Sequence, residues 1–408
     1  MNLPPPLPPP PQHDDPIIMQ FKPVDGQWEL TEDTINRIDP ETGHTILHNY
    51  YRYINTTPLA VYRFLIETLG CDVNAQDKYN NTPLPYAIGR FDPRNGGGNI
   101  AVLMYLLTQK AVNVNINIRN QNDTTLLHFA CDNINNLPLE IFEVLMKIEG
   151  CDINAQDRDN NTPLHYAIGR FDPRNGGNIT VLHYLLAQKG INANIKGLFG
   201  GTFLHKACEN INALPLEIFK VLIETLGCDI NAQDDKNNTP LHYALENFNP
   251  NDGDINALTY LINQKNVDVN INNIDDTALL HSACNNINNL SLGIFKCLIE
   301  TMGSDINAQD DKSNTPLHYA LENFNPNDGG DINALAYLLN QMNVDVNPTC
   351  DNYRIILHKA CACRPFSFPN SRSSDDVDNL NAECDSILCQ FVGMIAERCV
   401  QHILDEMS

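Results

Sequence analysis

A seven-residue phrase recurs through most of the chain and constrains its fold more than any other feature. Its clearest copy is Asn161-Thr162-Pro163-Leu164-His165-Tyr166-Ala167. Eight variants surround it: Thr45-Ile46-Leu47-His48, Thr82-Pro83-Leu84-Pro85, Leu126-Leu127-His128, Thr202-Phe203-Leu204-His205, Thr239-Pro240-Leu241-His242, Leu279-Leu280-His281, Thr315-Pro316-Leu317-His318 and Ile356-Leu357-His358. Between their His positions (Pro85 in one copy) the spacings are 37, 43, 37, 40, 37, 39, 37 and 40 residues. The alternation makes a pair of units, 76 to 80 residues long, the underlying repeat, and such arrays stack each unit on its neighbours.

Each unit has the same local pattern. A turn rich in Asn, Asp and Gly precedes the phrase, and Thr-Pro then begins a first helix, because Pro is tolerated in the first helical turn. After a loop, a second segment carries apolar residues at helical spacing, as in Ile218, Phe219, Leu222 and Ile223. The sequence therefore predicts an all-α chain with two helices in each unit.

This pattern resembles the ankyrin repeat, a β-turn followed by two antiparallel helices and built around Thr-Pro-Leu-His-x-Ala. The resemblance covers residues 43–361 and implies an all-α ankyrin-repeat solenoid of nine units. An ankyrin unit has about 33 residues, so the units here carry extra residues, which we place in long loops between the two helices.

The extra loop residues differ between even and odd units. The even loops contain Arg90–Gly96, Arg170–Gly176, Glu246–Gly253 and Glu322–Gly329, and the odd loops are shorter, as in Asn210–Pro215. We expect stacking to align each kind of loop in a column. The even column changes from Arg-containing in its first two copies to acidic in its last two.

The two ends of the chain depart from the repeat pattern. Residues 1–16 are rich in Pro and predict a disordered tail, or alternatively a ligand for an aromatic-lined groove of the SH3, WW, EVH1 or profilin type. Residues 17–42, which contain Trp28, predict a cap on the first unit. Residues 362–408 predict a loop followed by a capping helix, whose apolar positions lie within residues 383–406.

Charge and Cys usage exclude several classes of function. The net charge of −24 disfavours binding to nucleic acid or to anionic membranes. No apolar run has membrane-spanning length and the first residues lack a signal-peptide pattern, so we expect a cytoplasmic protein, with delivery into a host cytosol left open. Cys residues recur in register, which favours small core residues in a reducing compartment over a disulfide framework. They lie at two positions of the unit: Cys131, Cys208, Cys284 and Cys361, and Cys71, Cys151 and Cys228.

Three sets of residues resemble chemical sites, and for each the sequence favours a structural role. The His of the phrase is too widely spaced for several copies to share one metal ion, and the resemblance implies that it bonds to backbone between neighbouring units. Cys361, Cys363, Cys384, Cys389 and His402 lack the spacing of a zinc site. The loop from Asn323 has Ala334 where a calcium loop needs Glu. We therefore expect no enzyme, no metal and no cofactor.

The resemblance implies that protein partners bind the concave face made by the turn tips and the first helices. The tips vary while the framework repeats, which is typical of a recognition surface. Leu198 and Phe199 are the principal candidates, because apolar residues stand where exposure is expected; the alternative is that Phe199 folds back onto its own stack. The other candidates are Lys78, Tyr79, Arg119, Arg158 and Tyr353.

One modification is also implied by the resemblance. Ankyrin repeats that end in Asp-Val-Asn or Asp-Ile-Asn are substrates of the asparaginyl hydroxylase of hypoxia signalling. The matching residues are Asn74, Asn154, Asn231, Asn270, Asn307 and Asn347.

The sequence thus favours a non-enzymatic protein-binding module, in the style of ankyrin effectors from intracellular bacteria or large viruses that act on host proteins. The alternative is an adaptor whose C-terminal helix recruits a second complex, such as a ubiquitin ligase. Residues 383–406 are too short for a three-helix F-box. A third hypothesis, an enzyme concealed in the array, has no local support. Pro85 replaces the His of the second unit, where we predict a weaker tie between turn and helix.

Overall fold

The computed structural model describes residues 38–94, 100–108, 114–325 and 330–341, and all regular structure in these ranges is helical. The chain falls into two compact blocks that divide between Leu198 and Phe199. We call them the N-terminal block and the C-terminal block. The Pro-rich tail, Trp28, Tyr353, Asn347 and the segment 383–406 lie outside the described residues.

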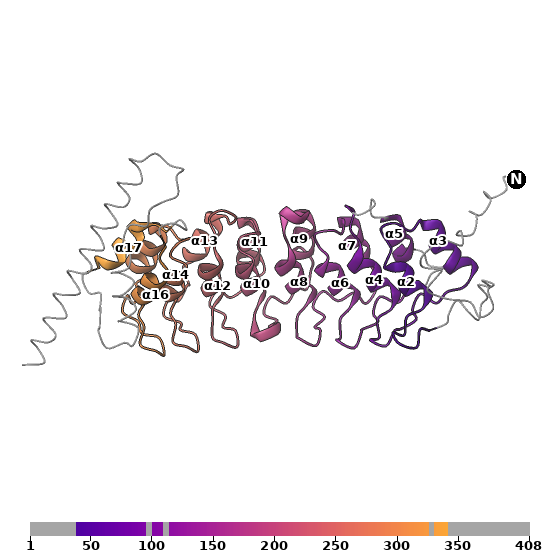
Figure 1. Cartoon of the computed structure of the whole chain (residues 1–408), viewed down its shortest axis with the longest axis horizontal. Coiled ribbons are helices and arrows are strands. Elements are labelled where there is room, and N and C mark those ends of the chain that lie inside the picture. Colours follow the sequence, from indigo (N-terminus) through magenta and orange to yellow (C-terminus); the bar gives the residue numbers. More distant parts are fainter. Residues whose placement is uncertain (1–37, 95–99, 109–113, 326–329, 342–408) are drawn as a thin grey trace, which may run out of the picture. The chain divides into compact units, whose positions relative to one another are not determined.

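The N-terminal block contains four repeats, each with a first and a second helix (Figure 1). The first helices are α2 (Ile46–Tyr51), α4 (Pro83–Arg90), α6 (Leu126–Asp132) and α8 (Pro163–Arg170). The second helices are α3 (Leu59–Arg63), which continues into the π-helix η2 (Phe64–Thr68), α5 (Ile100–Thr108), α7 (Leu139–Leu145) and α9 (Ile179–Leu186). A short 3₁₀ turn, η3 (Pro173–Asn175), lies in the loop before α9.

The C-terminal block repeats this order. Its first helices are α10 (Phe203–Glu209), α12 (Pro240–Asn247), α14 (Leu279–Asn285) and α16 (Pro316–Asn323). Its second helices are α11 (Leu216–Lys220) with η5 (Val221–Thr225), α13 (Ile255–Ile262), α15 (Leu292–Lys296) with η6 (Cys297–Thr301), and α17 (Ile332–Leu339). The helical-repeat fold predicted from the phrase is confirmed for repeats 1 to 8.

The phrase explains where each first helix begins. Thr162 has extended backbone angles (φ −94°, ψ 166°) and acts as the N-cap, and Pro163 occupies the first helical position, where its missing N–H costs no hydrogen bond. Thr239 and Thr315 begin α12 and α16 in the same way. Local sequence and fold therefore agree at each of these helix starts.

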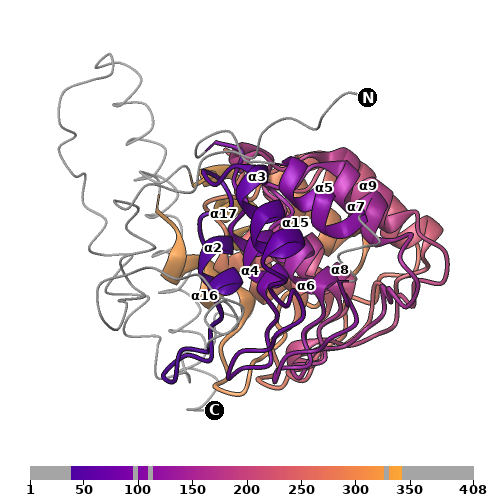
Figure 2. The ribbon, with the colours of Figure 1, turned by 90° about the vertical axis from the view of Figure 1, so that its right-hand side faces the viewer.

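Within each block, neighbouring first helices pack in one row and neighbouring second helices in another. The two rows and the turns that project beyond the first helices are seen in Figure 2. Phe142, Phe219 and Phe295 fill the second-helix row and are completely buried. Cys131, Cys208 and Cys284 are also completely buried and not in disulfides, which confirms their predicted role as small core residues.

Asn side chains of the odd loops clamp the even loop that follows. Asn212 Nδ2 donates to the Asn247 carbonyl (2.6 Å), and Asn212 Oδ1 accepts from the Asn249 N–H (2.8 Å). The same two-bond contact is made by Asn55, Asn135 and Asn288. Each side-chain amide thus bonds to backbone groups where a first helix ends and the even loop begins.

A second set of Asn residues clamps the even loop that precedes. Asn286 Nδ2 donates to the carbonyls of Leu245 and Phe248, both at 2.8 Å. Asn133 makes the equivalent bonds to Ile88 (2.7 Å) and Phe91 (2.8 Å). Even and odd loops are therefore interleaved, and the extra residues tie neighbouring repeats together.

Candidate partner-binding surface

In the even repeats the turn before the first helix is built around a buried carboxylate, and in the third and seventh repeats Asn120 and Asn273 take its place. In the fourth repeat, Asp157 Oδ1 accepts from the N–H groups of Asp159 (3.0 Å) and Asn161 (2.9 Å), and Asp157 Oδ2 accepts from the Tyr166 hydroxyl (2.7 Å). Asn160, at the apex, has a left-handed backbone (φ 62°), which Asn tolerates well. Equivalent carboxylate-centred turns are formed by Asp77, Asp234 and Asp310.

The His of the phrase bonds to the next repeat in five repeats, through His48, His128, His205, His242 and His281. His128 Nδ1 accepts from the Thr125 N–H (3.1 Å), so the ring proton lies on Nε2, which donates to the Asn161 carbonyl (3.1 Å). Burial lowers the pKa of His128, and it lowers the pKa of His242 to about 4. The neutral ring is thus a structural hydrogen-bonding group, as the resemblance implied.

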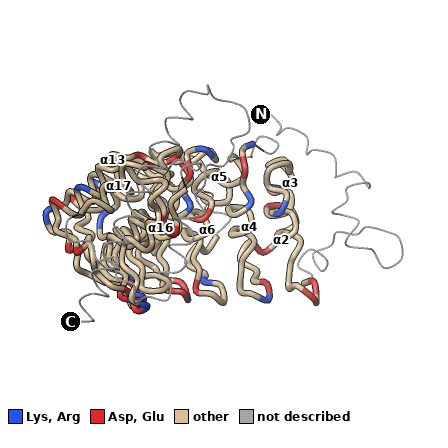
Figure 3. The backbone as a smooth tube through the Cα atoms, turned by 60° about the vertical axis from the view of Figure 1, so that its left-hand side comes forward, with Lys and Arg blue, Asp and Glu red and all other residues tan. Residues whose placement is uncertain are grey.

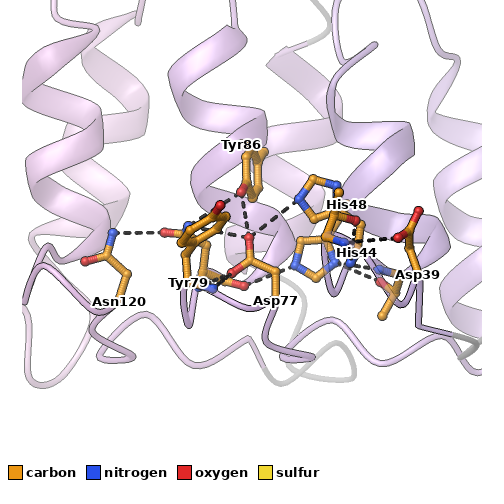
Figure 4. A network of polar contacts seen from close by, with 10 residues as sticks. Asp39, His44, His48, Asp77, Tyr79, Tyr86 and Asn120 are labelled. Carbon is orange, nitrogen blue, oxygen red and sulfur yellow. Dashed lines mark hydrogen bonds and ion pairs between the residues drawn. The ribbon is translucent and has the colours of Figure 1, made fainter.

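The first two repeats contain an extended form of this network (Figure 4). Asp77 Oδ2 accepts from the Tyr86 hydroxyl (2.6 Å) and lies 3.6 Å from His44 Nε2. The rings of His44 and His48 are stacked, with centroids 5.2 Å apart. Burial, followed by the hydrogen bond to Asp77, raises the pKa of Tyr86 to about 12. The network is therefore a satisfied polar core beneath the turns.

Backbone hydrogen bonds connect one turn tip to the next. In the N-terminal block, the Gln121 N–H donates to the Tyr79 carbonyl and the Arg158 N–H donates to the Asn122 carbonyl, both at 2.9 Å. These bonds hold the tips in a row beyond the first helices. Side chains on the tips therefore have fixed spacing.

Most of the predicted binding residues in the N-terminal block are exposed on this row. Lys78 and Arg158 are exposed, and Tyr79 is 52% exposed. Arg119 is also exposed, but its Nη1 donates to the carbonyls of Gln156 (3.0 Å) and Asp123 (3.4 Å). Arg119 thus ties the third turn to the fourth, a role that its charge alone did not predict.

The fifth turn departs from the carboxylate-centred design. Gly197 stands where other repeats have Asp or Asn, and the Leu198 N–H instead donates to Asn161 Oδ1 (3.1 Å). A Cβ atom added to Gly197 would lie 2.4 Å from Asn161 Oδ1, so this close approach requires glycine. Leu198 is 38% exposed.

Phe199 lies in the same turn with a left-handed backbone (φ 57°, ψ 24°). Such angles are rare and strained for a bulky side chain. It is 70% exposed, which argues against the alternative in which its side chain folds back onto its own repeat. The Asp235 N–H donates to the Phe199 carbonyl (2.9 Å), which continues the row of tip-to-tip bonds in the C-terminal block.

Ile274 is an exposed tip residue that the sequence did not single out. It is 56% exposed and occupies the same turn position as Asp235 and Asp311. Its N–H donates to the Lys236 carbonyl (2.9 Å). The sequence did indicate it, because Ile274 is apolar while Asp235 and Asp311, at the same position of the adjoining repeats, are charged.

The Asn residues at the repeat ends are engaged in contacts between repeats. Asn231 Nδ2 donates to the Asn266 carbonyl (2.6 Å) and Asn231 Oδ1 accepts from the Asp268 N–H (3.0 Å). Asn154 makes the equivalent pair of bonds, and Asn74 Oδ1 accepts from the Asn115 N–H. For Asn270 and Asn307 the bonds are local instead, from their N–H groups to Asp268 and Asp305 two residues earlier.

Within the described ranges, no group of three or more His, Cys, Asp or Glu side chains is placed to hold a metal ion. No helix in the same ranges is long and apolar enough to cross a membrane.

Comparison with known proteins supports the repeat assignment. Residues 94–196 and 173–273 match the family model of ankyrin repeats in three copies. A fowlpox virus protein named as an ankyrin repeat protein is 30% identical over 139 residues, which are 28% of this chain and 20% of that protein. A Rickettsia felis protein with a similar name is 39% identical over 90 residues, which are 22% of this chain and 38% of that protein.

A third relative, from Dictyostelium discoideum, is named as a serine/threonine-protein kinase and is 33% identical over 106 residues. That match covers 26% of this chain and 11% of the other protein. The chain thus spans between 11% and 38% of the lengths of these relatives. Together with the helix pairs and the His-bridged turns, the family match shows that residues 94–273 form an array of ankyrin repeats.

Proposed function

We propose that the chain is a non-enzymatic binding module that holds a protein partner on its turn tips and first helices. Ankyrin repeats are typical of protein–protein interaction modules, which supports the general class. The observation that carries the proposal is Phe199, a large apolar side chain that is 70% exposed in a strained left-handed conformation. Backbone strain of this kind persists where the surrounding structure fixes it, and it concentrates at functional sites.

The comparison with other turns supports this role for Phe199. The equivalent residues of the neighbouring repeats are polar, namely Asn122, Asp159, Lys236 and Asp275. Exposed aromatic residues supply much of the binding energy at protein interfaces. A residue that is costly in the free protein and solvent-exposed is therefore best explained by a contact that forms with a partner.

The test compares the wild-type chain with Phe199→Asn in affinity purification from host-cell lysate, followed by binding measurements with the purified partner. Asn removes the ring and keeps the left-handed turn, because Asn occupies such positions in other turns of this chain. The control is Ile255→Ser, which removes an apolar side chain that is 42% exposed at the start of α13, away from the tips. We expect the partner's affinity to fall at least tenfold in Phe199→Asn and to stay unchanged in the control.

Equal affinity of wild type and Phe199→Asn would refute the proposed role of this tip. Leu198→Asn tests the adjacent residue, which is less exposed, and a smaller loss is expected.

We further propose that the chain acts in the cytoplasm on proteins of a host cell. The viral relative and the Rickettsia felis relative support this extension, since both are named as ankyrin repeat proteins. Fractionation of host cells that express the chain, with recovery in the membrane or nuclear fraction, would contradict the cytoplasmic part.

A further inference from the structure

The two blocks differ strongly in charge. Residues 38–198 contain 13 Lys and Arg against 15 Asp and Glu, whereas residues 199–341 contain 6 against 19. All 6 basic residues of the second range are Lys, because it contains no Arg. The near-identical repeats of the C-terminal block have thus kept the fold while changing the surface to a strongly acidic one.

Much of the change lies at the ends of the even first helices and in the even loops, and Figure 3 marks charges on the tips as well. At one tip position the N-terminal block has Glu41, Lys78, Gln121, Arg158 and Leu198, and the C-terminal block has Asp235, Ile274 and Asp311, of which Asp235 and Asp311 are followed by Lys236 and Lys312. At the ends of the even first helices, Gly-Arg in the N-terminal block becomes Glu-Asn in the C-terminal block. The pairs are Gly89-Arg90 and Gly169-Arg170, then Glu246-Asn247 and Glu322-Asn323.

Two apolar side chains rise from this acidic face. Phe199 is 70% exposed and Ile274 is 56% exposed, and the tip between them carries Asp235 and Lys236. The bonds from the Asp235 N–H to the Phe199 carbonyl and from the Ile274 N–H to the Lys236 carbonyl, both 2.9 Å, fix the order of these tips. The result is a pair of apolar contacts set among carboxylates.

We infer that this tip-and-first-helix face of the C-terminal block binds a basic protein segment that presents apolar residues beside its Lys or Arg side chains. The inference rests on the proposed partner-binding function and names the chemistry of the partner. Complementary charge steers such a segment to the face, and burial of Phe199 and Ile274 holds it there. A nucleic acid does not fit, because the carboxylates repel phosphate.

The experiment titrates the full chain into a fluorescent peptide in which Lys and Leu alternate at helical spacing. A peptide with Glu in place of every Lys is the first control. The test variant is Asp235→Lys with Asp311→Lys, changes that the fold accepts because Lys78 occupies the same tip position in the second repeat.

The matched control variant is Glu217→Lys with Glu224→Lys. It changes the net charge equally, on the second-helix row, and Lys147 already occupies the position of Glu224 in the third repeat. We expect the Lys peptide to bind the wild-type chain. Its affinity should fall about tenfold in the tip variant and less than twofold in the control variant, and the differences in affinity from wild type should shrink at high salt.

Equal losses in the two variants would overturn the inference, because net charge rather than this face would then attract the peptide. Preference for the Glu peptide, or failure of the wild type to bind the Lys peptide, would overturn it too. If Phe199→Asn abolishes binding to a natural partner while the tip charges have no effect on that partner, the proposed function stands and only the basic chemistry is refuted.

Discussion

Protonation of the buried His column should weaken the stack in mildly acidic solution. Burial lowers the pKa of His242 from 6.5 to about 4, so between these values the unfolded chain binds more protons than the folded one. The contribution of neutral His242 to the free energy of unfolding is therefore complete above pH 6.5 and is lost as pH falls from 6.5 towards 4. Full protonation would cost about 3 kcal/mol, and at pH 5 the loss from this one residue is about 2 kcal/mol.

Hydrogen exchange on the full chain can measure this loss locally. We compare peptides that cover α12 and α14 at pH 7.5 and pH 5, corrected for the intrinsic pH dependence of exchange, in wild type and in His242→Gln. Gln does not titrate, so the drop in protection between the two pH values should be smaller in the variant by about 2 kcal/mol.

His183→Gln serves as the control, since His183 lies on the second helix α9, away from the turns. It should leave the pH dependence of α12 and α14 unchanged. An identical pH dependence in wild type and His242→Gln would refute the argument that this ring is held neutral by the fold.

Three further predictions concern stability. Asn212→Ala removes two hydrogen bonds between loops and should lower the free energy of unfolding by about 1–2 kcal/mol, against no measurable change for Asn256→Ala, whose side chain bonds only to Asp254 nearby. In the sixth repeat the Thr239 hydroxyl lies 2.9 Å from His242 Nδ1, whereas Ala278 stands at the equivalent N-cap of the seventh repeat. Ala278→Thr should therefore raise the free energy of unfolding in urea by about 1 kcal/mol, and Thr239→Ala should lower it by a similar amount. Pro85→His should add the missing tie of the second repeat and raise its exchange protection by about 1 kcal/mol, and equal protection of repeats two and four in the wild type would contradict the reasoning.

The helix starts and the core positions of the repeats could be predicted, because there the residue type alone determines the role of the residue. Thr162 and Pro163 begin a helix by local preference, and Cys208, like Cys131 and Cys284, fills a small core position. The His of the phrase was assigned to backbone contacts from the resemblance, and the geometry of His128 bears this out.

The clamps and the exposed tip could not be derived in the same way. Asn212 bonds to a carbonyl and an N–H of another repeat. Every residue has these backbone groups, so no particular residue type in the sequence identifies the partner of Asn212. The exposure of Phe199 goes with two successive left-handed residues, Phe199 and Gly200, and with Gly197 at the position where repeats two to four and six to eight have an Asp or Asn side chain that bonds to the turn. The backbone conformation of this turn depends on all of its residues and on the neighbouring turns, so it cannot be predicted from any single residue.

The two sets of Asn clamps also decide how a chain of this kind can change its length. The even loops of the second and sixth repeats are held from both sides, the latter by Asn212 and Asn286. Loss of one repeat would bring two loops of the same kind together and leave their carbonyls without a donor. Recombination that preserves the fold should therefore insert or delete whole pairs, so viable length variants should differ by steps of 76 to 80 residues.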